Sequence, residues 1–375
     1  MNVSKWWKIS NSVSLLFLIL IGGMWIDTNS KTGDSQHNRL TNMREVNKDL
    51  EKRFSTIQST DAVPTGVYIQ SLKFNNSSEV NFTGYIWQAY DRTLTENKNL
   101  EELEKLKVGF ILPESVESSS NVEPKLIYRK VRKDEDKKDK EVLGWYFEAT
   151  LKQKFNYSKY PFDHKIAWIR LWSRDFEQGK LLVPDFVGYE FPRDEDKFDE
   201  DGKARFGYDT DIVLGHWQLV ETFFDYHGQE LNSNFGIFDQ GSRKVHPELY
   251  FNVVLKRRFL NSFVVYILPL VVIACLTFAT LMMITKDPAK ESGLGMNTSG
   301  VIGVCSGLFF VVLLSQVQIR EQFAGSSIVY VEYFYPLMYL ALLGVSVNSY
   351  LFALPNESKN RILSWINEGD NVHPK

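Results

Sequence analysis

The sequence has little cysteine, no excess of positive charge and none of the short motifs that mark common enzymes. Only two cysteines occur among 375 residues, and both, Cys275 and Cys305, lie inside long apolar stretches, so the polar region before them folds without disulfides. The net charge of −3 provides no basic surface for nucleic-acid phosphates. No nucleophile elbow, phosphate-binding glycine loop or paired-histidine helix appears. The sequence therefore predicts a protein that is not an enzyme, uses no cofactor and binds no nucleic acid.

One acidic stretch has the composition of a metal site. Residues 194–201 read DEDKFDED and could offer carboxylate oxygens to calcium. Their spacing does not match the EF-hand loop, and runs of like charge are usually solvated. The six histidines show no zinc-type clustering. We therefore expect no metal site.

Four long stretches without charge predict a membrane protein. They cover residues 9–26, 259–285, 292–319 and 333–356, and each is long enough to cross a hydrocarbon core of about 30 Å as a helix. Lys5 and Lys8 precede the first stretch, so the positive-inside rule places the N-terminus in the cytoplasm and the large polar region outside. A cleaved signal peptide is the alternative, but no small-x-small cleavage pattern follows the stretch. Alternating directions then leave both termini in the cytoplasm.

The polar region has the pattern of a β-sandwich. After an N-terminal anchor at residues 1–30 and a helical linker at residues 31–61, short alternating stretches predict antiparallel strands through residues 62–258, with no convincing helix between them. Residues 259–356 predict three transmembrane helices. Residues 357–375 form a cytoplasmic tail, either frayed or lying on the membrane as a short amphipathic helix. The expected fold is thus a periplasmic or extracellular antiparallel β-sandwich joined to a helical membrane domain.

This layout resembles the pentameric ligand-gated ion channels, the Cys-loop receptor superfamily, in its prokaryotic-type members. The resemblance covers most of residues 62–353. It rests on five stretches in the family's order, which are GYIWQAYDRTL, YPFDHKIAWI, GHWQLVETFF, YFNVVLKRRFLNSFVVYILPL and SSIVYVEYFYPLMYLALL. The resemblance implies a homopentamer in the inner or plasma membrane, with membrane lipid, a small-molecule ligand and a permeant ion as its other partners.

The stretch YPFDHKIAWI matches the family's signature loop, which presses an apolar tip on the membrane helices. The resemblance implies that this tip contacts the loop at residues 320–327. Asp163 is expected beside Arg257 and Arg258, because opposite charges attract in a partly dry interface. The residues so implied in gating or coupling are Glu79, Tyr160, Pro161, Phe162, Asp163, Arg257, Arg258 and Arg320. The alternative is an ordinary sandwich corner with a solvated aspartate.

The chain departs from the family pattern in three places. The family's disulfide would fall near Gln153 and Ala167, and neither is cysteine, as in prokaryotic members. The family has four helices after the outer domain and this chain has three. The missing helix runs in the same direction as residues 9–26, so we infer that these residues take its place. The third departure is the pore helix, whose four glycines between residues 295 and 307 also resemble a close-packing interface.

Residues 292–319 are expected to line the pore with one helical face. Alignment from the start of this stretch gives the stripe Gly293, Asn297, Gly300 or Val301, Val304 and Leu308, and Glu291 is a further candidate at the inner mouth. Glu291 would form an acidic ring that favours cations, unless Lys290 offsets it. Alignment from Glu332 shifts the whole register.

Agonists of the family bind between subunits in an aromatic cage. The corresponding candidates here are Trp172, Arg174, Phe176, Tyr226, Phe235 and Phe238. Arg174 stands where the family has its key aromatic residue, which disfavours a standard amine cage and suits an acidic ligand. The rings could instead hold a cation through their faces, or simply pack within the domain.

The resulting prediction is a homopentameric ligand-gated ion channel. The alternative is a non-conducting membrane receptor or accessory subunit that keeps the ligand-binding sandwich. The helix at residues 292–319 discriminates between them, because a water-lined polar stripe favours a channel and a dry glycine seam favours the receptor.

Overall fold

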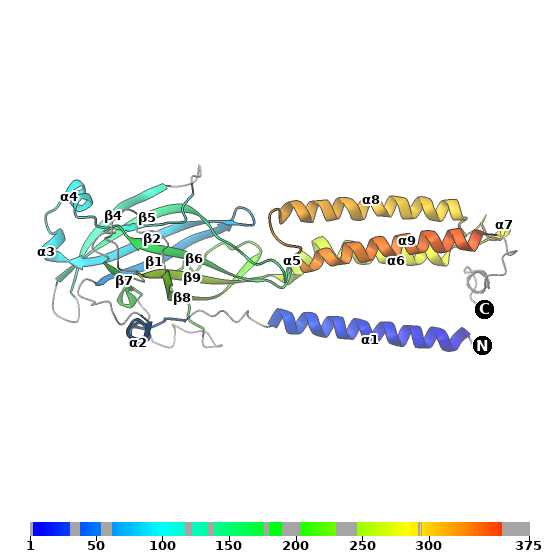
Figure 1. The fold of residues 1–375 in the computed structure, drawn as a ribbon, viewed down its shortest axis with the longest axis horizontal. Coiled ribbons are helices and arrows are strands. Elements are labelled where there is room, and N and C mark those ends of the chain that lie inside the picture. Colours follow the sequence, from blue (N-terminus) through cyan, green and yellow to red (C-terminus); the bar gives the residue numbers. More distant parts are fainter. Residues whose placement is uncertain are drawn as a thin grey trace, which may run out of the picture. The chain divides into compact units, whose positions relative to one another are not determined.

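The computed structural model describes residues 3–30, 38–53, 62–116, 122–133, 139–175, 180–189, 203–229, 246–291, 293 and 295–354 (Figure 1). The chain divides into two compact units. We call Gly33–Phe155 with His164–Lys256 the sheet unit, and Met1–Thr32 with Asn156–Asp163 and Arg257–Lys375 the helix unit. The acidic residues 194–201, the linker residues 54–61 and the tail at 357–375 lie outside the described residues.

The sheet unit is built from two sheets. Its described strands are β1 (Ala62–Phe74), β2 (Glu79–Asp91), β3 (Phe110–Ile111), β4 (Val122–Lys133), β5 (Asp139–Lys152), β6 (His164–Ser173), β7 (Leu181–Pro184), β8 (Trp217–Gln229) and β9 (His246–Arg257). One sheet has the order β4-β5-β2-β1-β7 and the other the order β3-β6-β9-β8. The expected helical linker contains α2 (Met43–Arg53).

The first sheet is mixed, which corrects the expectation of wholly antiparallel strands. β1, β2, β4 and β5 pair antiparallel, but β7 pairs parallel with β1 from Ala62 opposite Leu181 to Thr65 opposite Pro184. A parallel neighbour needs a crossover connection. The chain supplies one by running through β6 in the other sheet before it enters β7.

The two sheets share one hydrophobic core. In β6, Ala167, Ile169 and Leu171 alternate with half-buried residues, as expected for a strand with one face buried. These three residues belong to the same buried cluster as Phe82 of β2 and Phe147 of β5. Burial on this scale stabilises the unit without any disulfide.

Trp87 of β2 is fixed at the edge of this core. Its Nε1 donates to Asp185 Oδ2 at 2.8 Å, and Arg132 donates to the two oxygens of the same carboxylate at 2.8 and 3.0 Å. A Cβ at Gly66 or Gly188 would lie 2.1 or 2.7 Å from the indole ring. Both positions therefore require glycine for this packing.

Two short helices between β2 and β3 correct the expectation that no helix interrupts the strands. They are α3 (Arg92–Thr95) and α4 (Leu100–Lys105). Asn99 and Glu102 form a capping box at the start of α4, with bonds of 2.8 and 2.9 Å between their side chains and backbone nitrogens. That motif stabilises a helix N-terminus even in a short segment.

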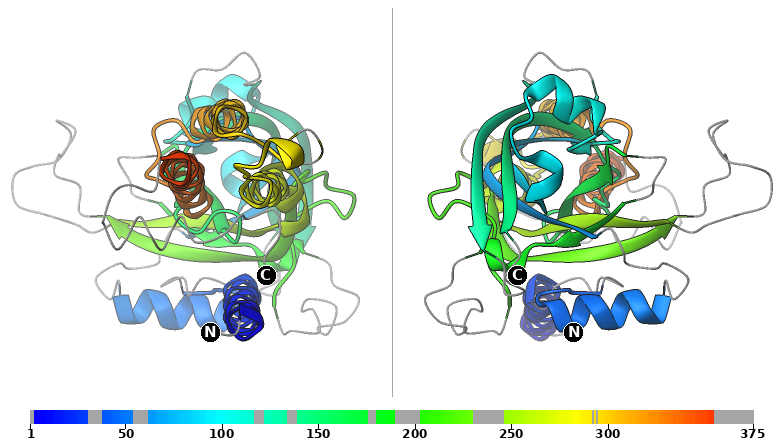
Figure 2. Two further views of the ribbon diagram at one scale, coloured as in Figure 1. Left: turned by 90° about the vertical axis from the view of Figure 1, so that its right-hand side faces the viewer. Right: turned by 90° about the vertical axis from the view of Figure 1, so that its left-hand side faces the viewer.

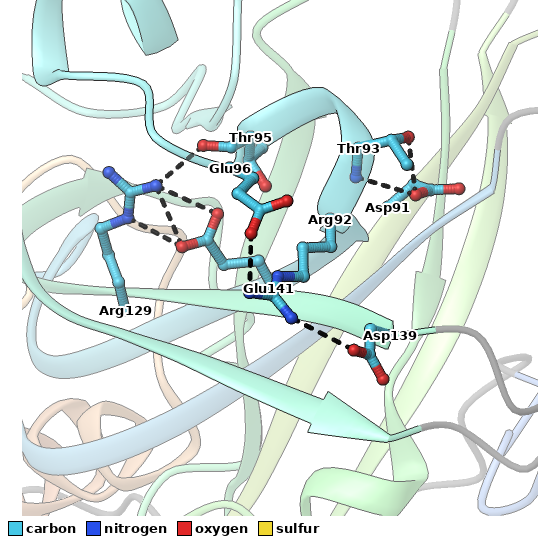
Figure 3. A network of polar contacts seen from close by, with 8 residues as sticks. All are labelled: Asp91, Arg92, Thr93, Thr95, Glu96, Arg129, Asp139 and Glu141. Carbon is cyan, nitrogen blue, oxygen red and sulfur yellow. Dashed lines mark hydrogen bonds and ion pairs between the residues drawn. The ribbon is translucent and has the colours of Figure 1, made fainter.

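A network of charged side chains anchors α3 to the edge of the first sheet (Figure 3). Arg92 pairs with Asp139 of β5 at 3.2 Å. Arg129 of β4 pairs with Glu141 at 2.9 Å and donates to the Thr95 carbonyl at 2.9 Å. These contacts position the Asp-Arg-Thr-Leu segment that follows Trp87 in the chain.

The helix unit contains α1 (Val3–Ser30), α5 (Phe259–Ser262), the π-helical η3 (Phe263–Ile267), α6 (Leu268–Met282), α7 (Pro288–Glu291), α8 (Thr298–Gln322), the 3-10 helix η4 (Tyr330–Tyr333) and α9 (Phe334–Ala353). Four described spans are long and apolar enough to cross a membrane, one near the N-terminus and three after the sheets. Helices α6, α8 and α9 each contact the other two and are seen end-on in Figure 2.

Candidate functional site: the corner loop against the apolar helices

The segment Asn156–Asp163, which we call the corner loop, joins β5 to β6 but belongs to the helix unit. Successive backbone bonds shape it, from Tyr160 N to Tyr157 O at 2.9 Å and from Phe162 N to Lys159 O at 2.7 Å. The Tyr160–Pro161 peptide bond is cis. Tyr160, Pro161 and Phe162 are all buried. The apolar corner is therefore packed inside protein rather than exposed.

Asp163 and Arg257 form a buried two-point ion pair. Arg257 Nε donates to Asp163 Oδ1 at 2.6 Å and Nη2 donates to Oδ2 at 3.0 Å, and the side chains are only 7% and 2% exposed. A backbone bond from Arg257 N to Asp163 O at 3.3 Å joins the same residues. Bidentate arginine–carboxylate pairs are directional as well as strong, so this pair fixes the end of β9 against the corner loop.

Tyr160 lies at the centre of an aromatic cluster. The Arg257 guanidinium lies 4.7 Å from the centre of its ring, and the Phe323 ring, just after α8, lies 4.6 Å away. Tyr266 is a third neighbour at 5.9 Å. Burial raises the pKa of the Tyr160 phenol, and burial likewise raises that of Tyr157 to about 12. Both phenols are therefore neutral near pH 7, so their rings add no charge beside the ion pair.

The segment between α8 and α9 receives the corner loop. Tyr157 and Tyr160 contact Phe323, and Tyr330 N donates to Ser158 O at 3.1 Å. Arg320 is not part of this contact. It pairs with Glu332 at 3.2 Å and donates to Ser326 O at 2.7 Å. Arg320 therefore joins the end of α8 to η4 and to the connection between them.

Trp25 of α1 also reaches this site, although the sequence analysis did not single it out. Its ring lies 5.8 Å from Phe162, 6.1 Å from Phe259 and 6.4 Å from Phe334. Its Nε1 donates to the Tyr330 hydroxyl at 3.2 Å. The available signal was its position near the end of an apolar stretch, where tryptophan favours the membrane interface.

Two predicted coupling residues lie elsewhere. Arg258 is exposed and begins α5 as its N-cap, and none of the interactions described joins it to Asp163. Glu79 belongs to the sheet unit, where its carboxylate accepts from Asn76 Nδ2 at 2.7 Å within the β1–β2 turn. The structure thus brings Arg257, but not Arg258, to Asp163.

The start and the packing of α8 give the predicted pore-lining residues different surroundings. The helix begins at Thr298, because Asn297 caps it by accepting from Gly300 N at 2.8 Å. Glu291 therefore precedes the helix in α7, and Asn297 Nδ2 donates to it at 2.6 Å. Val301 has no exposed surface within the protomer. It packs inside the protomer. The other two candidates, Val304 and Leu308, are half-buried beside it.

The ligand-binding candidates do not form one site among the described residues. Tyr226 is a core residue, fully buried with its hydroxyl donating to Leu182 O at 2.8 Å, which argues against a ligand role. Arg174 is exposed, and Trp172 Nε1 donates to Glu248 at 2.7 Å. Phe176, Phe235 and Phe238 lie outside the described residues.

Trp172 belongs to a charged cluster on the β6 face opposite the core. Arg170 pairs with both Glu114 and Glu248, the latter at 3.1 Å, and Tyr250 donates to Glu248 at 3.3 Å. Burial raises the pKa of Glu114, while the neighbouring Arg170 opposes that rise. No group of three or more metal-ligating side chains occurs in the described part of the chain.

No protein-family model matches this chain, and no curated protein matches it. The case for its function therefore rests on the motifs in its sequence and on the geometry described above.

Proposed function

We propose that the protein is a homopentameric ligand-gated ion channel. In this proposal the two sheets form a β-sandwich on the periplasmic or extracellular side of the membrane, and both termini are cytoplasmic. Lys5 and Lys8, in α1 before its uncharged stretch, support this orientation. The observation that carries the proposal is the corner loop, a connection between two strands whose tip is built into the apolar helix unit.

The corner loop supplies a mechanical route between strands and helices. It continues directly into β6, and β9 ends at Arg257, so that only Arg258 separates β9 from the start of α5 at Phe259. A ligand that favours one arrangement of the strands would therefore act on Asp163 and Arg257 together. Tyr160 and Phe162 of the same loop contact Phe323 and Tyr330, which bound the connection after α8, so the change would reach that helix. Gating is then a population shift between two packed states.

The uncovered surface of α8 is available for contacts between several copies of the chain. Phe310 and Leu314 are 61% and 68% exposed in one protomer, and both are large apolar side chains. A helix embedded in a lone subunit could cover such residues with lipid only. A ring of copies covers part of α8 with neighbouring helices and encloses the remainder around an axis.

The cluster on β6 and β9 is the place where we propose that the ligand acts. Two carboxylates, Glu114 and Glu248, share Arg170 beside the rings of Trp172 and Tyr250. A small polar ligand could compete for these hydrogen bonds and alter the pairing of β6 with β9.

The test is the subunit count of the full-length protein in lipid nanodiscs, measured by native mass spectrometry. We expect five copies. A monomer, a dimer or any other non-pentameric assembly would leave no five-fold pore, and the protein would then be a non-conducting receptor. Currents are a second step, because a silent membrane without a known agonist decides nothing.

A further inference from the structure

The burial of α8 separates its faces clearly. Val301, Cys305, Val312 and Ile319 are at most 3% exposed and recur at helical spacing, so they form the face packed in the protomer. On the same side, Gln316 accepts from the Tyr339 hydroxyl of α9 at 2.6 Å. The opposite face must meet something outside the protomer.

That opposite face is a mixed polar and apolar stripe. Ser299, Ser306, Phe310, Leu314, Val317 and Glu321 follow one another at intervals of a full turn or two and are all exposed. Two serines lie toward one end, a carboxylate ends the other, and three apolar side chains lie between. The Ser306 hydroxyl donates to Ile302 O at 2.8 Å within the helix, so the Glu321 carboxylate is the group on this stripe that lipid disfavours most.

We infer that α8 turns this stripe to the channel axis and that the channel conducts cations. The inference rests on the proposed function and replaces the stripe through Val301. Phe310, the largest side chain on the stripe, forms the constriction. Hydrophobic constrictions of this kind close a pore by excluding water.

The described charges at the two ends of α8 support the choice of ion. Arg320 is paired with Glu332, and Lys286 lies 4.6 Å from the centre of the Phe352 ring, so both cations turn toward their own protomer. Glu321 is exposed at the C-terminal end of α8, and Glu291 is exposed in α7, before α8 begins, where it accepts from Asn297 Nδ2 at 2.6 Å. Rings of carboxylates attract cations and repel anions.

Cysteine labelling of the full-length protein in nanodiscs tests the stripe and needs no agonist. The background is Cys275→Ala, because Cys275 is exposed while Cys305 is buried. Ser306→Cys and Leu314→Cys are treated with a membrane-impermeant cationic methanethiosulfonate, and the mass gain is measured. Phe309→Cys and Val311→Cys are the matched controls, since these residues lie at intermediate depth and are 40% and 49% exposed in one protomer.

We expect both stripe positions to be labelled at least tenfold faster than both controls. Equal rates, or faster labelling of either control, would overturn the stripe. The subunit count of the same sample separates the two failures. Five copies with the wrong labelling pattern refute only the stripe, whereas another count refutes the channel itself.

The ion class is tested with Phe310→Ala, which widens the constriction and is expected to conduct without agonist. In a potassium chloride gradient its current should reverse near the potassium equilibrium potential, and Glu321→Gln added to it should shift the reversal toward zero. Reversal near the chloride potential would overturn cation selectivity. A silent Phe310→Ala pentamer would overturn the constriction.

Discussion

Breaking the ion pair between Asp163 and Arg257 is the sharpest test of the corner loop as a structural joint. The side chains are 2% and 7% exposed, so removing either partner leaves an uncompensated charge in a nearly dry site. Such a loss costs about 3–5 kcal/mol. Arg257→Ala also removes the cation above the Tyr160 ring, which adds about 0.5–2 kcal/mol. We therefore expect Arg257→Ala to be at least as destabilising as Asp163→Ala.

A double-mutant cycle measures the pair itself. Equilibrium unfolding in mixed detergent micelles would be followed for both single variants and for the double variant. Because the double variant leaves no orphan charge, it should cost less than the sum of the two, with a coupling free energy of at least about 1.5 kcal/mol. Arg258→Ala is the matched control, since Arg258 is adjacent but exposed, and it should change stability by less than about 0.5 kcal/mol. Strictly additive single costs would refute the buried pair.

Three further changes test other parts of the structure. Trp25→Ala should lower the free energy of unfolding by about 2–4 kcal/mol in the same micelle assay, because it removes three ring contacts and a hydrogen bond. Leu18→Ala is the control and should be nearly neutral, since the Leu18 side chain is 67% exposed. Equal effects of the two substitutions would contradict the docking of α1. Gln153→Ala should lower the free energy of unfolding by about 2–4 kcal/mol, because the buried Gln153 side chain bonds both the N–H and the carbonyl of Trp168. Lys154→Ala, at an exposed site, is the control. An equal loss of stability in both variants, measured by thermal or chemical unfolding, would refute this role of Gln153. Burial raises the pKa of Glu114 above its ordinary value of 4.5, so the folded protein holds that proton more tightly than the unfolded chain. The stability of the natural protein relative to Glu114→Gln should then be greatest below pH 4.5 and fall as the pH rises, and a pH-independent difference in melting temperature would exclude the shift.

The sequence predicted the architecture because its signals are long and regular. Uncharged stretches of helical length and alternating apolar and polar residues can be recognised without knowing distant contacts. The four apolar helices and the two sheets could therefore be predicted from the sequence. The meeting of Asp163 with Arg257 came from the resemblance of the loop to a known family, not from spacing. The capping box of Asn99 and Glu102 is a helix signal in the sequence, although α4 was not predicted from it.

The register of α8 could not be predicted for a physical reason. Apolar residues occur on all sides of α8, so the periodicity in sequence that normally reveals a buried face is nearly absent. Valine occurs both on the packed face, at Val312, and on the exposed stripe, at Val317. The uncharged stretch also starts at residue 292, before the first residue of the helix. The helix begins at Thr298 because Asn297 caps it, and no charged residue marks that start. Only the packing against α9 separates the faces.

The attachment of α1 to the rest of the helix unit has a different basis from the packing of α6, α8 and α9. Among the side chains described in α1, Leu15, Leu16 and Leu18 are more than half exposed, and the ring contacts are made by Trp25. Lipid solvates leucine as well as another helix does, so apolar surface alone gives α1 no reason to dock. The indole differs because it reaches the corner loop, α5 and α9 at once and donates to Tyr330. In the proposed channel, the attachment of α1 described here therefore involves an aromatic residue at the coupling site.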